Sequence, residues 1–213
     1  MVCSSSFKLI FCYQRPNNSE LLLQLKELRL ESLGELVSIG LENSWTEPFV
    51  RNIETFEVIS CSSLENLVTC TVSFSNLICL KVENCDNLSY LFTSSTAKSL
   101  AQLQRMEIIW CKSIEEIVSK EGDVSDEDEI IFWQLSCLNL DNLWNLRSFY
   151  RGSLNFPSLK ELSIAHCIEM VTLFPSILKA DKLTQVIIDY KAIPLDTDLN
   201  STIRKEFEIK VCI

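Results

Sequence analysis

Cysteine and histidine, the residues that most often carry nucleophilic or metal chemistry, occur ten times and once in this chain of 213 residues. The single histidine, His166, could act as a general base or a metal ligand only if Cys, Asp or Glu side chains converged on it in the fold. No C-x-x-C pair occurs, so the usual zinc and thioredoxin patterns are absent. The sequence therefore predicts an exposed histidine, with no metal site and no catalytic site.

Acidic side chains gather in one stretch, from Glu115 to Glu129, which holds −7 of the formal net charge of −10. The stretch lacks the D-x-[DN]-x-[DN]-G frame of a calcium loop. No glycine in the chain precedes a Lys-Ser or Lys-Thr pair, as it would in a phosphate-binding loop. We expect residues 118–129 to form a mobile, solvated loop or an electrostatic handle for a partner. Clustered Lys and Arg are missing, which argues against a nucleic-acid surface.

Four of the cysteines share one position of a repeating pattern. Between residues 74 and 92, apolar side chains are spaced by 3, 2, 3, 3 and 3 residues, which fits neither a helix nor a long strand. These apolar positions are Leu77, Leu80, Val82, Cys85, Leu88 and Leu91. The same frame places Cys61, Cys111 and Cys167 in the position of Cys85, where free cysteine packs as a small apolar side chain. Core packing is favoured over a redox role, because buried thiols have a raised pKa and are inert.

The frame recurs along most of the chain, with first positions near residues 25, 53, 77, 103, 135, 159 and 183. The recurring L-x-x-L-x-L-x-x-N/C-x-L pattern is typical of leucine-rich repeats. It predicts an α/β leucine-rich-repeat solenoid, a curved horseshoe with a parallel β-sheet on its concave face and short helices and irregular loops on its convex face. The repeats would fill residues 25–190, after a partial N-terminal repeat or cap at residues 1–24.

The segments between and after the predicted strands differ from one another. A Ser/Thr cap followed by helix formers predicts a short helix within residues 94–103, and Pro175 indicates a second helical return. In the C-terminal tail, residues 191–213, the alternation of apolar residues from Glu206 to Ile213 predicts a cap strand over the last edge of the sheet. The sequence shows no signal peptide and no apolar run of membrane length, so we expect a cytoplasmic protein with reduced cysteines.

The outward positions of the predicted strands form the candidate site. In each strand the leucine positions point inward, and neighbouring strands line the residues between them into ladders. The resulting concave face is broad, mixed in charge and slightly apolar, with Ile59, Ile109 and Trp110 exposed. Such a face suits the binding of another protein, because Trp and Arg are favoured interface anchors. The candidate partner-binding residues are Arg29, Glu57, Ile59, Lys81, Glu83, Arg105, Glu107, Ile109, Trp110, Asn139, Asp141, Glu161 and His166.

A family resemblance lies in three stretches: AKSLAQLQRMEIIWCKSIEEIV, DEIIFWQLSCLNLDNLWNLRSF and FPSLKELSIAHCIEM. With the Cys-type repeat and the acidic insert, they make the chain similar to intracellular plant disease-resistance proteins of the coiled-coil, nucleotide-binding, leucine-rich-repeat class. The resemblance implies a sensor that recognises a pathogen effector or a guarded host protein and holds a nucleotide-binding half inactive. That half, with its ADP/ATP site, is not among these 213 residues, so the resemblance implies no cofactor and no catalytic residue here.

Two hypotheses of function follow. The first is a module of an immune receptor whose partner is a protein: an effector, a host protein or the nucleotide-binding domain of a parent receptor. It involves neither nucleic acid nor membrane. The second is a repeat scaffold outside immunity, such as the substrate adaptor of a ubiquitin ligase, which predicts an F-box-like segment near one end. No such segment is visible in the sequence. An enzyme ranks last, for want of a paired acid/base or nucleophile constellation.

Overall fold

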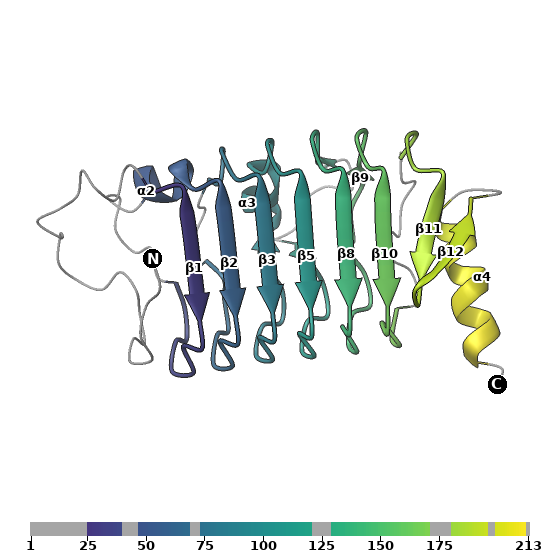
Figure 1. Ribbon diagram of the computed structural model, residues 1–213, viewed down its shortest axis with the longest axis horizontal. Coiled ribbons are helices and arrows are strands. Elements are labelled where there is room, and N and C mark those ends of the chain that lie inside the picture. Colours follow the sequence, from purple (N-terminus) through teal and green to yellow (C-terminus); the bar gives the residue numbers. More distant parts are fainter. Residues whose placement is uncertain are drawn as a thin grey trace, which may run out of the picture.

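The computed structural model of the chain describes residues 25–39, 47–68, 73–120, 129–170, 180–195 and 199–211. Within these residues the strands of one sheet lie side by side in the order β1-β2-β3-β5-β8-β10-β11-β12 (Figure 1). All neighbouring pairs are parallel except the last, β11 with β12. The predicted leucine-rich-repeat solenoid is confirmed. The strands are β1 Glu27–Glu31, β2 Thr55–Ile59, β3 Cys79–Glu83, β5 Arg105–Ile109, β8 Cys137–Asp141, β10 Glu161–Ala165, β11 Gln185–Ile188 and β12 Lys191–Pro194.

Strands β1, β2, β3, β5 and β8 each bury their second and fourth side chains and turn the other three away from the core. In β3, Leu80 and Val82 are buried, whereas Lys81 between them is partly exposed. The register pairs Leu80 with Phe56 on one side and with Met106 on the other. Because side chains alternate with a period of two and the register is constant, residues at the same repeat position form unmixed rows across the sheet.

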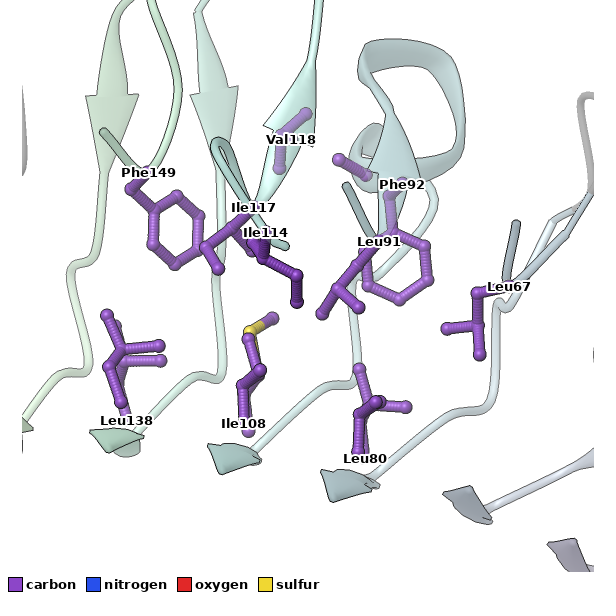
Figure 2. Packing of buried hydrophobic residues seen from close by; sticks show 14 of the residues in the cluster. Leu67, Leu80, Leu91, Phe92, Ile108, Ile114, Ile117, Val118, Leu138 and Phe149 are labelled. Atoms are coloured by element: carbon purple, nitrogen blue, oxygen red, sulfur yellow. The ribbon is translucent and has the colours of Figure 1, made fainter. Parts of the chain in front are cut away.

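The core lies between the sheet and the segments that return behind it. Figure 2 shows the strand residues Leu80, Ile108 and Leu138 facing side chains from the returns, among them Leu91 and Phe149. All five are at most 1% exposed. Burial of one such side chain contributes roughly 1.5–3 kcal/mol. Since the rows cross repeat boundaries, each repeat draws stability from its neighbours as well as from itself.

The shared cysteine position forms a buried row, as the repeat frame predicts. Cys61, Cys85, Cys111 and Cys167 are each 0% exposed. The thiols donate to nearby backbone carbonyls, and the Sγ atom of Cys85 lies 3.4 Å from the carbonyl oxygen of Glu83. A hydrogen bond with Cys111 raises the pKa of Cys85 to about 12, and burial raises the pKa of Cys167 to about 12. These thiols are therefore neutral packing groups, not thiolate nucleophiles.

A residue with a left-handed backbone follows every strand from β1 to β10 in the large sheet. In five of these six residues the N–H donates to a backbone carbonyl oxygen on the next strand, as from Trp110 to Asp141 at 3.0 Å, whereas His166 donates to the side-chain carboxylate of Asp189. The conformation turns the chain out of the sheet at the same point in each repeat. Asparagine and histidine accept it readily, but a bulky tryptophan is uncommon there. The residues are Ser32, Ser60, Asn84, Trp110, Asn142 and His166, with φ between 52° and 57°.

The returns contain short helices and two small parallel sheets. The helices are α2, Glu47–Asn52, and α3, Ser94–Lys98. The second confirms the helix expected within residues 94–103, and the hydroxyl of Thr93 caps it by accepting from the N–H of Thr96. The small sheets pair β4, Phe92–Thr93, with β6, Val118–Ser119, and β7, Ile130–Ile131, with β9, Leu154–Asn155.

Strand β6 corrects the boundary of the acidic loop, which we expected to begin at residue 118. Val118 is buried and pairs with Phe92, because an apolar residue at this point extends the core instead of entering solvent. The acidic residues 121–128 themselves lie outside the described residues, as do residues 1–24 and the return predicted at Pro175.

The C-terminal end differs from the prediction. Residues 206–211, expected as part of a strand, belong to helix α4, Leu199–Val211, and residues 212–213 lie outside the described residues. The helix buries Leu199, Thr202 and Ile203, which have the spacing of one helix face. The sheet edge is covered earlier instead, where β12 pairs antiparallel with β11. The tail carries both the two-residue alternation of a strand and the apolar spacing of a helix face. The helix forms because the first turn packs its apolar side chains in the core. No helix in the described part of the chain has the length and apolar character needed to cross a membrane.

Candidate functional site

The outward side chains of the seven parallel strands share one face of the large sheet, which we call the exposed face and which corresponds to the predicted concave face. The register places the candidate residues of the central row directly beside one another: Arg29, Glu57, Lys81, Glu107 and Asn139. A second row passes from Glu31 through Ile59, Glu83 and Ile109 to Asp141. Thus the structure brings these predicted residues together, because equal positions in each repeat stack across strands.

The cations of the exposed face all lie on β1, β3 and β5, and each contacts an acid. Arg29 contacts Glu57 at 2.7 Å and Glu31 at 3.0 Å. Lys81 contacts Glu83 at 2.8 Å, and Arg105 contacts Glu107 at 3.4 Å. Hydrogen bonds to these carboxylates raise the pKa of Arg29 and of Lys81. The three cations therefore stay charged, but their charge is already matched within the sheet.

Acids outnumber bases on the exposed face by eight to three, which gives it a formal charge of −5. The bases are Arg29, Lys81 and Arg105. The acids are Glu27, Glu31, Glu57, Glu83, Glu107, Asp141 and Glu161 on the strands and Asp189 directly after β11. An excess of this size attracts positively charged ligands and repels anions.

At the C-terminal end of the face, Asp141 is the centre of a hydrogen-bonded cluster. Its Oδ1 accepts from Nδ2 of Asn142 at 2.7 Å and lies 3.2 Å from Nδ1 of His166. Its Oδ2 accepts from the hydroxyl of Tyr190 at 3.0 Å, which raises the pKa of that phenol. The rings of His166 and Tyr190 are 5.6 Å apart between centroids, and the backbone N–H of His166 donates to Asp189 at 2.8 Å.

The sequence predicted Asp141 and His166 as separate site residues but missed their contact and missed Tyr190. The signal was available in the repeat, since His166 and Tyr190 both follow a strand at the same register position. His166 is exposed, as expected. In the described ranges, no group of three or more His, Cys, Asp and Glu residues is arranged to hold a metal ion.

Two predicted apolar contacts are less exposed than expected. Ile59 and Ile109 are half-buried, and each lies between acidic side chains on the two neighbouring strands. Trp110, in contrast, is 45% exposed at the left-handed position after β5. Among the three residues, only the tryptophan offers a large apolar surface to a partner.

The turns that follow the strands hold further apolar side chains that the sequence analysis missed. Trp144 follows β8 and is 43% exposed, Ile168 follows β10 and is 70% exposed, and Tyr190 follows β11 and is 69% exposed. We call Trp110 and these three residues the aromatic rim, which thus consists of three aromatic side chains and one isoleucine. Trp144 and Ile168 occupy the same turn position as Lys112, three residues after the end of their strands. The Nζ atom of Lys112 lies 5.7 Å from the ring centroid of Trp144 and 3.1 Å from Asp86.

Comparison with known proteins identifies relatives of one kind. A family model described as "Plant disease resistance protein RPS2-like, leucine-rich repeats" matches residues 69–190. A probable disease resistance protein of Arabidopsis thaliana is 32% identical over 158 residues, which are 67% of this chain and 22% of that protein.

Two further relatives from Arabidopsis thaliana are similar over comparable lengths. The disease resistance protein SUMM2 is 29% identical over 169 residues, 76% of this chain and 17% of that protein. The disease resistance protein RPS5 is 29% identical over 144 residues, 67% of this chain and 15% of that protein. The chain thus spans less than a quarter of the length of these relatives. No solved structure matches the chain.

Proposed function

Because the chain belongs to the RPS2-like leucine-rich-repeat family of plant disease resistance proteins, we propose that it is the protein-recognition module of an innate immune receptor. In this proposal the exposed face binds a pathogen effector or a guarded host protein. The same module would restrain a nucleotide-binding domain in the cytoplasm until recognition occurs. The observation that supports the proposal is the family match combined with a broad exposed face that lacks a covering layer among the described residues.

The composition of the exposed face also supports recognition of a protein. Charged ladders with several exposed aromatic side chains give a surface that is polar at large and apolar at a few points, as interaction surfaces are. The thiols of the cysteine row are buried in the core and offer no group to this face. A non-immune scaffold, the second hypothesis from the sequence, gains no support from relatives that are all disease resistance proteins.

The proposal is tested by co-purification from plant tissue with the tagged chain, in three forms. The first is the unchanged chain, and the second carries Glu57→Gln, Glu107→Gln and Glu161→Gln on the exposed face. The third carries Trp133→Ala, an exposed residue in the segment that leads into β8. Neutral substitutions are preferred over charge reversal of Arg29 or Lys81, because reversal would bring like charges together within the sheet.

We expect specific proteins, including a nucleotide-binding domain supplied in the same tissue, to be retained by the Trp133 variant and lost by the triple variant. Quantitative mass spectrometry of the eluates measures this difference. The proposal fails if every protein that binds the unchanged chain binds the triple variant equally well, provided that circular dichroism shows both chains to be folded.

A further inference from the structure

The aromatic rim is a strip of apolar surface along one edge of the sheet. Trp110, Trp144, Ile168 and Tyr190 all lie in the turns directly after β5, β8, β10 and β11, which are the turns at the lower edge of the sheet in Figure 1. Neighbouring strands are about 4.8 Å apart, so the strip crosses roughly 15 Å of consecutive repeats. Exposed apolar side chains that gather on consecutive repeats mark an interaction site more often than scattered single residues do.

Stability of the repeat does not explain the tryptophan at position 110 of the rim. The position of Trp110 is held by Ser or Asn in four of the other repeats, with the same left-handed backbone and the same kind of N–H contact to the next strand. A bulky side chain is disfavoured in that conformation, and Trp110 keeps 45% of its surface exposed. The turn conformation therefore does not require a tryptophan, and its side chain is not buried in the core.

The charges beside the rim favour a partner of positive charge. Arg29, Lys81 and Arg105 are each matched by an acid within 3.4 Å, and Lys112 on the rim side contacts Asp86 at 3.1 Å. The exposed face as a whole keeps an excess of five negative charges. This excess of negative charge would repel an incoming anion and attract an incoming cation.

From these observations we propose that the rim and the acidic exposed face together bind a basic polypeptide segment. An apolar side chain of the segment packs on Trp110, Trp144 and Ile168, while its Lys or Arg side chains lie along the acids of the face. The inference rests on the proposed function, protein recognition by this face, and names the chemistry of the partner. The apolar side chains of the rim hold the bound segment, and the excess of negative charge orients the segment and raises its rate of association.

The test uses three short labelled peptides and the whole chain. One peptide alternates Lys with Leu and Phe, the second has Glu in place of every Lys, and the third keeps Lys but has Ser in place of every apolar residue. Fluorescence anisotropy measures binding of each peptide at low and at physiological salt. We expect the basic apolar peptide to bind, with an affinity that falls as salt rises, and the other two to bind at least about tenfold more weakly.

Variants then assign the site. Trp110→Ala and Trp144→Ala should each weaken binding of the basic apolar peptide by about tenfold, as loss of an aromatic anchor does. Trp133→Ala is the matched control, because Trp133 is 56% exposed and precedes β8, whereas the rim residues follow their strands. Its binding should equal that of the unchanged chain.

Any of three results overturns the inference: no binding of the basic apolar peptide, equal binding of its acidic counterpart, or an equal loss with Trp133→Ala. These results leave the proposed function standing if co-purification still depends on the exposed face, because that experiment makes no assumption about the charge of the partner. Conversely, peptide binding with no face-dependent partner in plant tissue would support the surface chemistry and refute the immune role.

Discussion

The exposed face has two parts that differ in how their side chains are held. From β1 to β5, ion pairs such as Arg29 with Glu57 and Lys81 with Glu83 run between partly exposed side chains. From β8 to β12, Asp141 is held by Asn142, His166 and Tyr190 in a hydrogen-bonded cluster beside exposed aromatic rings. The inward residues beneath both parts are the same kind of buried apolar row. One repeat frame can thus carry a charged surface and an aromatic surface without a change of core.

The largest loss of stability is expected in the core, which the two parts of the exposed face share. Cys85→Asp places a carboxylate in a position that is 0% exposed, which should destabilise the chain by roughly 3–5 kcal/mol. Cys79→Asp is the matched control, because Cys79 is half-buried on the exposed face between Thr55 and Arg105 and the change should cost less than about 1 kcal/mol. Urea unfolding followed by circular dichroism measures both. Equal midpoints for the two variants would show that the cysteine row is not a core element.

The second effect separates the aromatic part from the charged part. Asp141→Ala removes the acceptor for three side chains and should cost about 1–2 kcal/mol. The loss of amide protection should be confined to β8 through β12 in hydrogen exchange, with β1 to β3 unchanged. Asn139→Ala, on the same strand but outside the cluster, is the control. A variant at Asp141 that unfolds like the Asn139 variant would mean that the cluster contributes no rigidity.

The third effect tests the charged part. Lys81→Gln should lower stability by about 0.5 kcal/mol at low salt, because ion pairs between partly exposed groups are weak. High salt should abolish this difference, since screening acts on partly exposed charges. The effect of Asp141→Ala should persist at the same salt concentration. If both variants respond to salt alike, the distinction between the two parts is wrong.

The smallest expected change in stability occurs at alkaline pH and involves only Tyr190 in the aromatic part. The hydrogen bond to Asp141 raises the pKa of Tyr190, so folding favours the neutral phenol. This contribution is fully present below the ordinary tyrosine pKa of about 10 and is lost as pH rises through the raised pKa of the folded state. The unchanged chain should therefore lose more stability above about pH 10 than Tyr190→Phe. Thermal unfolding over this pH range measures the difference, and parallel curves would contradict it.

The sequence predicted the repeat frame, the inward rows and the strand ladders because these depend on periodicity alone. Cys61, Cys85, Cys111 and Cys167 could be assigned to one buried row from the sequence alone. Trp144, Ile168 and Tyr190 of the aromatic rim, and the contacts within the Asp141 cluster, were missed for a different reason. They arise in turns, where Trp144 and Tyr190 become neighbours of other residues only once the repeat register is extended beyond the strand.

The tail could not be predicted by periodicity. An apolar alternation over a few residues from Glu206 onward competes with a helical spacing that begins at Leu199, and a short window does not distinguish them. The helix wins where Leu199, Thr202 and Ile203 can pack against the end of the solenoid. Local pattern therefore decides structure in the stacked repeats, but tertiary contacts decide it at the last repeat.

The left-handed residue after each strand has a consequence for how such a surface changes over generations. Serine, asparagine, tryptophan and histidine all occupy this point with φ between 52° and 57°, so the path of the main chain is indifferent to which of them is present. An exchange among these four residue types changes the side chain that a neighbouring molecule contacts while the path of the main chain is kept. Ser32, Asn84, Trp110 and His166 are then places where specificity can drift or be selected at small risk to the scaffold.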